Sequence, residues 1–221
     1  MPVNIDAYNK IIAELNQNDV TLVAVSKTKP VHDILELYNS GQKDFGENYV
    51  QELTEKAGQL PKDIHWHFIG HLQTNKVKYI APFISLIQSA DSRKLLAEIN
   101  KQAIINNRTI DCLLQVHIAA EETKFGFDEK ELHDIFDAGL IDFKNIRIRG
   151  LMGMASFTDD MNIVRNEFKS LRFLYEKYKS LDFDNCRFSV LSMGMSADYK
   201  TAIEEGSNMV RIGSLLFGKR H

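Results

Sequence analysis

The feature that most constrains the fold of this chain is a regular alternation of short apolar runs with segments of helical periodicity. The apolar runs occupy residues 20–26, 44–49, 64–70, 86–91, 110–119, 146–155, 187–195 and 209–217. Apolar residues three and four apart, which are typical of amphipathic helices, recur between them at 31–40, 92–106, 129–140 and 160–180. Strands that alternate with helices in this way pair in parallel, because each helix returns the chain to the same end of the sheet.

Eight such units in 221 residues predict an α/β fold, a single closed (β/α)8 TIM barrel at the compact end of its size range. The alternative is an open doubly wound sheet. Its usual phosphate fingerprint is absent, because Ser-Lys-Thr-Lys-Pro follows the first run and no Walker-type glycine loop occurs. We find no linker or low-complexity stretch. We therefore expect one domain over residues 1–221, with an extra N-terminal helix before the first strand.

Composition and charge exclude several classes of protein. Lysine and arginine number 27 and acidic residues 30, so the net charge of −3 argues against binding nucleic acid through bulk charge. A chain that is 44% hydrophobic is not disordered. Cys112 and Cys186 lack the paired spacing of a zinc ribbon or redox motif, which indicates a reducing compartment. No run is long enough to span a membrane, and we expect a cytoplasmic protein.

Lys27 is a candidate nucleophile, because functional residues of such barrels follow the carboxyl ends of the strands. Strand alternation places it on the same face as Val23 and Val25. Partial desolvation there would disfavour the ammonium form and make the neutral amine available to attack carbonyl compounds. The plainer alternative is a lysine that extends its amine to solvent. Lys29 competes for the role, but it lies beyond the strand beside Pro30, and we prefer Lys27.

Small residues lie toward the ends of the last two apolar runs: Ser192, Gly194, Ser196, Gly213 and Ser214. Many barrels hold a phosphate in these two loops, where backbone amides and small hydroxyls converge. Glycine and serine are also ordinary turn residues, so the pattern alone leaves both interpretations open.

Two further groups of polar residues lie within the predicted strands. Arg211 shares a face with Gly213, and a guanidinium inside a barrel requires either a carboxylate partner or a ligand. His65, His67 and His71 suggest a metal, but no residue supplies a third ligand by spacing. We therefore predict no metal site.

Six motifs together carry a resemblance to a known family. They are AVSKTKP (24–30), FGENYVQE (45–52), WHFIGHLQTNK (66–76), LMGMA (151–155), LSMGMSADY (191–199) and MVRIGSLLFG (209–218). In type and order they resemble the pyridoxal phosphate homeostasis proteins, the YggS/PROSC family. The resemblance implies a fold-type-III barrel, similar to the N-terminal domain of alanine racemase, that binds pyridoxal 5′-phosphate (PLP) through a lysine.

The resemblance also implies roles for individual residues. Lys27 of the AVSK motif would form the internal aldimine, Arg211 of the RIG motif would face the pyridine nitrogen, and Asn48 of the GEN motif would lie near the ring. The implied phosphate site falls on four residues at the exits of the last two runs, Ser192, Gly194, Gly213 and Ser214.

An arginine beside the ring nitrogen has a chemical consequence. Arginine always donates and leaves that nitrogen unprotonated, whereas an aspartate would keep it protonated and make PLP a strong electron sink. Carbanion chemistry is therefore poorly supported. Racemisation would also require a second acid/base, which the racemase resemblance assigns to a separate C-terminal domain. The sequence ends shortly after the eighth run, so we expect no such residue from the same chain.

The leading hypothesis is a PLP-binding protein for intracellular homeostasis, a carrier or regulator of free PLP without robust amino-acid turnover. We expect a monomer that meets PLP, free amino acids and, transiently, PLP-dependent enzymes, and that binds neither nucleic acid nor membranes. One alternative is an amino-acid racemase or an aldolase-like Schiff-base enzyme that uses Lys27. Another is a protein-docking barrel that does not bind PLP.

Overall fold

The computed structural model describes residues 3–120, 125–137, 140–181 and 184–218. Within them the strands are β1 Thr21–Val25, β2 Asp44–Glu47, β3 His65–Phe68, β4 Leu86–Ala90, β5 Ile110–Val116, β6 Ile146–Gly153, β7 Cys186–Met195 and β8 Met209–Ile212. They pair in parallel in chain order, and β8 pairs with β1 to close the barrel. This confirms the predicted (β/α)8 barrel.

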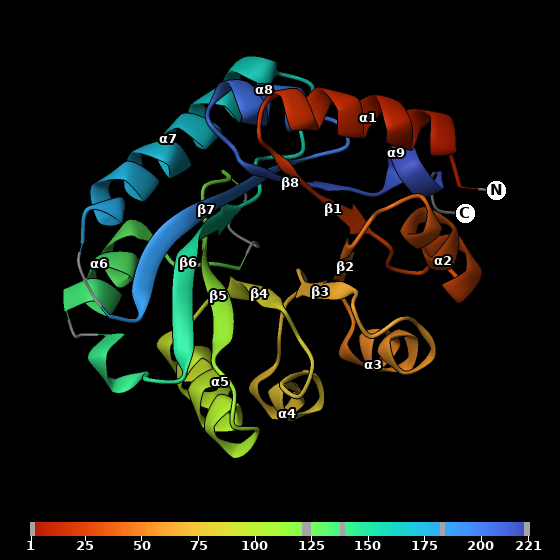
Figure 1. Cartoon of the computed structure of the whole chain (residues 1–221). Helices are drawn as coiled ribbons and strands as arrows, with labels where there is room; N and C mark the ends of the chain where they lie inside the picture. Colours follow the sequence, from red (N-terminus) through yellow and green to blue (C-terminus); the bar gives the residue numbers. More distant parts are fainter. Residues whose placement is uncertain (1–2, 121–124, 138–139, 182–183, 219–221) are drawn as a thin grey trace.

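Helices surround the strands on the outside of the barrel (Figure 1). The α-helices are α1 Ile5–Gln17, α2 Val31–Asn39, α3 Val50–Gln59, α4 Val77–Ile80, α5 Arg93–Ile105, α6 Glu129–Asp137, α7 Met161–Lys179, α8 Tyr199–Glu204 and α9 Ser214–Phe217. Two 3₁₀ turns, η1 Thr74–Lys76 and η2 Leu140–Asp142, lie among them.

The end of the last apolar run differs from the prediction. A strand was expected over 209–217, but β8 ends at Ile212 and the following residues form α9. The amides of Leu216 and Phe217 both donate to the carbonyl of Gly213, which is a helical turn. The run stays apolar because these two side chains are buried. Continuous hydrophobicity therefore could not separate a buried strand from a buried helix here.

The extra N-terminal helix lies in the outer ring beside α9 (Figure 1). Asn4 begins α1 by accepting a hydrogen bond from the amide of Ala7 at 3.0 Å, a common N-cap. Its own amide donates to the carbonyl of Leu216 at 2.8 Å. Because α9 is a single turn, α1 covers this part of the barrel and buries Tyr8 and Leu15 against it.

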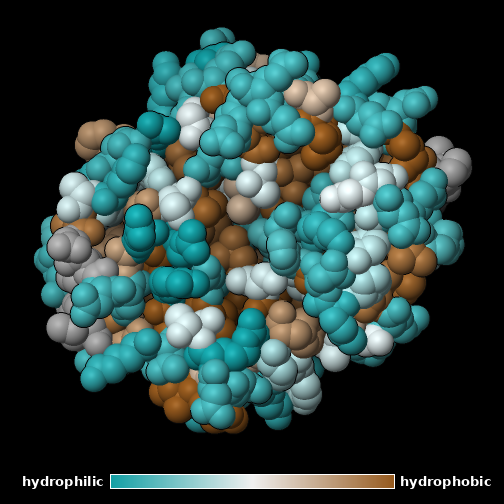
Figure 2. Space-filling view, in the orientation of Figure 1, coloured by the Kyte–Doolittle hydropathy of each residue, from teal (hydrophilic) through white to brown (hydrophobic). Residues whose placement is uncertain are grey.

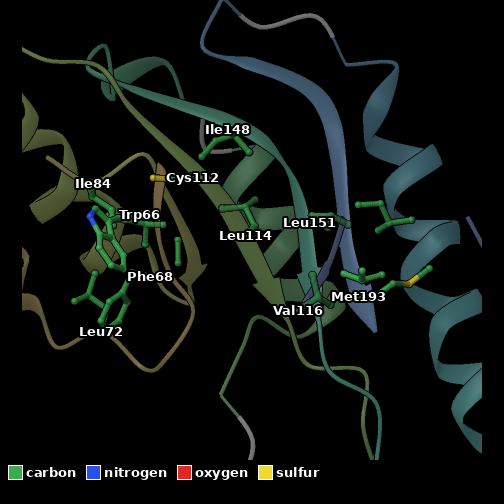
Figure 3. Packing of buried hydrophobic residues seen from close by; sticks show 14 of the residues in the cluster. Trp66, Phe68, Leu72, Ile84, Cys112, Leu114, Val116, Ile148, Leu151 and Met193 are labelled. Atoms are coloured by element: carbon green, nitrogen blue, oxygen red, sulfur yellow. The ribbon is translucent and has the colours of Figure 1, made fainter. Parts of the chain in front are cut away.

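Apolar side chains fill two separate layers. Between the strands and the helices, Cys112, Leu114 and Val116 of β5 point outward from the barrel with neighbours from β3 and β6 (Figure 3). A smaller cluster of Val23, Leu86, Leu113, Met152 and Met209 lies inside the barrel. Parallel strands buried on both faces appear in sequence as continuous apolar runs, which is why the strands were predictable.

The surface is mostly hydrophilic around its rim, and hydrophobic side chains show in a hollow near the centre of the view (Figure 2). No helix among the described residues is long and apolar enough to cross a membrane.

Candidate functional site

A cavity of about 640 Å³ opens at the carboxyl ends of the strands. Five of the seven site residues predicted from sequence line it, namely Lys27, Asn48, Arg211, Gly213 and Ser214. Other parts of the wall come from residues 154–159, between β6 and α7, and from residues 195–198, at and after the end of β7. The cavity therefore lies on the face where barrels of this kind carry their sites.

Lys27 lies half-buried in the turn that follows β1. The amide of Ser26 donates to the carbonyl of Gly46, and the amide of Lys29 donates to the carbonyl of Ser26, both at 3.0 Å. Between them Thr28 has a φ of +65°. A β-branched residue rarely adopts that conformation, so the turn that carries Lys27 is strained and must be held by its surroundings.

A largely buried group of charged and polar residues holds this turn. We call Ser26, Glu47, Glu52 and Lys56 the Lys56 cluster. The Lys56 ammonium donates to the carbonyl of Ser26 at 2.8 Å, to Glu47 Oε1 at 2.7 Å and to Glu52 Oε1 at 2.6 Å. Glu52 Oε1 also accepts from the amide of Thr28 at 2.5 Å. The side chain of Glu47 is fully buried, and this burial raises the pKa of its carboxyl despite the opposing effect of Lys56.

Asn48 follows β2 directly and approaches the loop after β3 very closely. A Cβ on Gly70 would lie 2.4 Å from the carbonyl oxygen of Asn48, so glycine is required there. The side-chain Oδ1 of Asn48 is buried and has no hydrogen-bond partner among the described residues. Buried acceptors are normally satisfied, so this atom fits a ligand that brings a donor.

Arg211 lies at the cavity wall with only 3% of its surface exposed. Its Nη1 donates to Ser192 Oγ at 2.6 Å and its Nη2 to the carbonyl of Gly153 at 2.9 Å. Burial lowers the pKa of Arg211 to about 10, with the charge of Asp198 acting in the opposite direction. The guanidinium therefore stays charged at neutral pH, while both of its hydrogen bonds go to neutral acceptors.

Two residues of the predicted phosphate site, Ser192 and Gly194, are not among the residues that line the cavity. Strand β7 ends at Met195, as the predicted run did, and both residues lie inside it. Ser192 is fully buried and donates to Gln88 Oε1 at 2.7 Å. Gly194 has a φ of +94°, and a Cβ there would lie 2.6 Å from the Cβ of Ala202. Its role is therefore close packing against α8.

Three consecutive residues, Met195, Ser196 and Ala197, occupy this part of the wall instead. Ser196 was among the small residues noted in the sequence, and its Oγ accepts from the amide of Gly213 at 3.3 Å. Asp198, which sequence reasoning missed, also lines the cavity. It accepts from the amide of Met195 at 2.5 Å, and burial raises the pKa of its carboxyl.

The three histidines do not converge on one point. His65 and His67 both contact Asp44 Oδ1, at 3.3 and 3.0 Å, whereas His71 contacts Asp91 Oδ2 at 2.9 Å. Within the described residues, no three histidine, cysteine, aspartate or glutamate side chains are grouped so that they could hold a metal ion.

Comparison with known proteins first identifies the class of protein to which this barrel belongs. The family model described as alanine racemase, N-terminal domain, matches residues 4–221. Among individual proteins, the pyridoxal phosphate homeostasis protein of Aquifex aeolicus (strain VF5) is 43% identical over 205 residues, which cover 92% of this chain and 89% of that protein. The chain belongs to the family of pyridoxal phosphate homeostasis proteins, as its motifs had indicated.

Two further comparisons agree with this assignment. The human protein of the same name is 40% identical over 210 residues, covering 90% of this chain and 76% of that protein. The structure of PipY from Synechococcus elongatus PCC7942, with PLP bound, has a TM-score of 0.84 and 33% sequence identity to this chain. That comparison covers 94% of this chain and 98% of PipY.

Proposed function

We propose that this chain binds PLP in the cavity at the carboxyl ends of its strands and acts in PLP homeostasis as a carrier or regulator. The observation that carries the proposal is that Lys27, Arg211 and the small residues Ser196, Gly213 and Ser214 line the same cavity. The PLP-bound structure of the related PipY and the names of the relatives support it.

The residues present fit each part of the cofactor. A cavity of about 640 Å³ is of the size that holds small ligands in other proteins. The amine of Lys27 suits an aldehyde, and the hydroxyls of Ser196 and Ser214 suit a phosphate. The buried and unpaired Oδ1 of Asn48 offers an acceptor for a hydroxyl group on the ring.

Lys27 is the residue that would hold the cofactor covalently. When bound, PLP supplies an aldehyde that condenses reversibly with amines and releases water. The Lys56 cluster fixes the turn that carries Lys27, through the carbonyl of Ser26 and the amide of Thr28. Lys27 itself lines the cavity. A bond of this kind can be exchanged for another amine, which suits a carrier.

Arg211 supports binding without turnover. With a pKa of about 10, its guanidinium remains a donor at neutral pH and does not readily give a proton to a ring nitrogen. The ring would then be a weak electron sink, and withdrawal of the Cα proton from a bound amino acid would be poorly supported.

The test separates carriage from catalysis. Protein and PLP are incubated with L-alanine in D₂O, and PLP release and Cα deuteration are followed by absorption and NMR, with PLP alone as the control. We expect PLP to raise the melting temperature, excess amino acid to release it, and no deuteration beyond the control. Deuteration over many turnovers would establish a racemase-type enzyme. Borohydride trapping of a carbonyl substrate in PLP-free protein would establish an aldolase-like one.

The same proposal covers location and partners. We place the protein in the cytoplasm as a monomeric, single-domain barrel, with free amino acids and PLP-dependent enzymes as its transient partners. Cys112 and Cys186 are both free and buried, which supports a reducing compartment. Sedimentation of the PLP-bound and PLP-free protein tests the monomer, and a stable dimer in either state would contradict it.

A further inference from the structure

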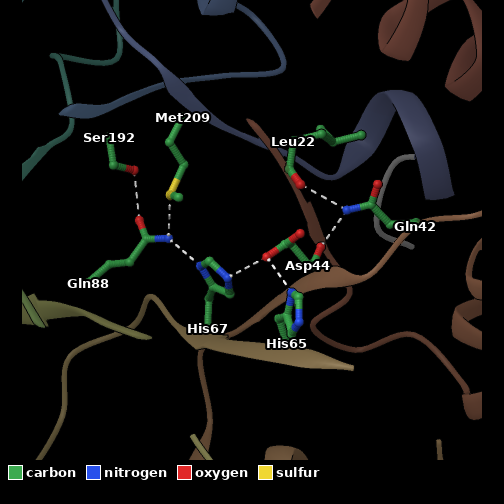
Figure 4. A network of polar contacts seen from close by, with 8 residues as sticks. All are labelled: Leu22, Gln42, Asp44, His65, His67, Gln88, Ser192 and Met209. Atoms are coloured by element: carbon green, nitrogen blue, oxygen red, sulfur yellow. Dashed lines mark hydrogen bonds and ion pairs between the residues drawn. The ribbon is translucent and has the colours of Figure 1, made fainter. Parts of the chain in front are cut away.

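Five polar side chains form a hydrogen-bonded chain through the inside of the barrel. We call Arg211, Ser192, Gln88, His67 and Asp44 the interior chain, and Figure 4 shows its last four members. They come from five different strands: β8, β7, β4, β3 and β2. The interior chain runs from the cavity wall at Arg211 to Asp44, the first residue of β2, and so reaches the amino-terminal side of the barrel.

Every hydrogen bond in the interior chain has a defined direction. Arg211 can only donate, so Ser192 Oγ accepts at 2.6 Å and donates its own hydrogen to Gln88 Oε1 at 2.7 Å. The amide nitrogen of Gln88 therefore faces His67 Nδ1, at 2.9 Å, and donates to it. His67 must then carry its proton on Nε2, which donates to Asp44 Oδ1 at 3.0 Å.

The bonds thus run head to tail from a cation to an anion. No member can be reversed alone, because reversal would place two donors or two acceptors face to face. The tautomer of His67 and the orientation of the Gln88 amide are assigned by this network. Hydrogen bonds aligned in this way polarise one another, so a change at one end alters the strength of the other hydrogen bonds in the interior chain.

The interior chain lies in a buried, largely apolar environment, which strengthens its hydrogen bonds. Gln88 and Ser192 are fully buried, and His67 is 4% exposed. Apolar side chains fill the rest of this layer, among them Leu86 and Met209. The amide of Gln88 also contacts the sulfur of Met209 at 3.3 Å, but a thioether is too weak an acceptor to replace the imidazole. A layer that served only to fill space would be apolar, since polar groups are costly to bury.

We propose that Gln88 and His67 are positioning residues that fix the Arg211 guanidinium through Ser192. The proposal rests on the proposed function, in which Arg211 faces the pyridine nitrogen of PLP. Without Gln88 the hydroxyl of Ser192 loses its acceptor and is free to rotate. Arg211 then keeps only the carbonyl of Gly153 as a fixed partner.

The first test removes the centre of the interior chain. Gln88→Met keeps the volume but removes the polar groups, and we expect PLP to bind about 3- to 10-fold more weakly, with a shifted absorption maximum. Gln42→Met is the matched control. Gln42 is also buried, and among the described residues its side chain donates to the backbone carbonyls of Leu22 and Asp44. The control should lose stability but keep both the affinity and the spectrum.

A coupling measurement distinguishes positioning from general loss of packing. If Gln88 acts through Ser192, adding Gln88→Met to Ser192→Ala should weaken PLP binding no further than Ser192→Ala alone. A second pair of variants tests His67. His67→Gln retains an acceptor toward Gln88 and a donor toward Asp44 and should preserve affinity, whereas His67→Phe should lose it. Additive effects, or equal behaviour of the two His67 variants, would overturn the proposal.

The last test needs no cofactor. In PLP-free protein, ¹⁵N NMR should show His67 as the Nε2–H tautomer, and the side-chain signals of Arg211 should shift in Gln88→Met but not in Gln42→Met. The Nδ1–H tautomer, or unshifted Arg211 signals, would refute the interior chain. Failure of the wild type to bind PLP would instead refute the proposed function. The NMR result on PLP-free protein would still test the interior chain.

Discussion

The two residues that define the cavity, Lys27 and Arg211, are held in opposite ways. The wall around Lys27 is fixed by buried charges, the Lys56 cluster, whereas the wall around Arg211 is fixed by neutral groups, Ser192 and the carbonyl of Gly153. Hydrogen bonds from either cation are charge-assisted, but Lys56 also forms ion pairs with two carboxylates. Ion pairs therefore hold the strained turn, whereas neutral acceptors leave the charge of Arg211 available to a ligand.

Removal of the cation from the Lys56 cluster should have the largest effect. Lys56→Met leaves the buried Glu47 and the partly exposed Glu52 without their partner, so we expect the free energy of unfolding to fall by about 3–5 kcal/mol. Urea denaturation measures it. The double variant Glu47→Gln/Lys56→Met should recover part of the loss. A loss below about 1 kcal/mol in the single variant would mean that the cluster is not what holds this wall.

The wall around Arg211 depends instead on close approach of the backbone. Gly194→Ala places a Cβ against Ala202 at a φ of +94°, and we expect a loss of about 1–3 kcal/mol in the same denaturation experiment. Gly58→Ala is the control, because a Cβ there meets open space in α3. It should stabilise the protein by up to about 1 kcal/mol. Equal effects of the two substitutions would contradict the packing argument.

The pH dependence of stability should differ between the wall around Lys27 and the wall around Arg211. We expect this effect to be smaller than those of Lys56→Met and Gly194→Ala. Burial raises the pKa of Glu47, so the folded chain binds its proton more tightly than the unfolded chain. The stability of the wild type relative to Glu47→Gln should therefore fall as pH rises through the window above the ordinary glutamate pKa. Burial lowers the pKa of Arg211 to about 10, so its window opens only above that pH, with the opposite slope.

Urea denaturation of wild type and Glu47→Gln between pH 4 and 8 checks this prediction, since groups that do not interact with Glu47 cancel in the difference. A difference that rises with pH would show that Lys56 outweighs the burial of Glu47.

The fold was largely predictable, because parallel strands buried on both faces appear as apolar runs in the sequence. The prediction of eight β/α units implied helices at every connection but gave no ranges for the short helices α3, α4 and α8. The segment Val50–Gln59, for example, is mostly polar, and short helices owe their stability to tertiary contacts that local periodicity does not reveal.

The site was predictable where it depends on strand ends. Lys27, Asn48 and Arg211 line the cavity because the carboxyl ends of parallel strands converge. Ser192, which was predicted for the same site, is fully buried within β7 and is not among the lining residues. The contact of Lys56 with Ser26 joins residues 30 positions apart, and no local sequence pattern predicts such a pair.

The most direct test of this account is the site of covalent attachment. PLP is added to wild type, Lys27→Ala and Lys29→Ala, absorption is recorded before and after borohydride, and the modified peptide is located by mass spectrometry. Lys29 is the control because its amine donates to the carbonyl of Phe217 at 2.7 Å. We predict a near-visible band that borohydride converts to a stable label on Lys27 in wild type and Lys29→Ala, and neither band nor label in Lys27→Ala. A label on another lysine, or full labelling of Lys27→Ala, would contradict the account.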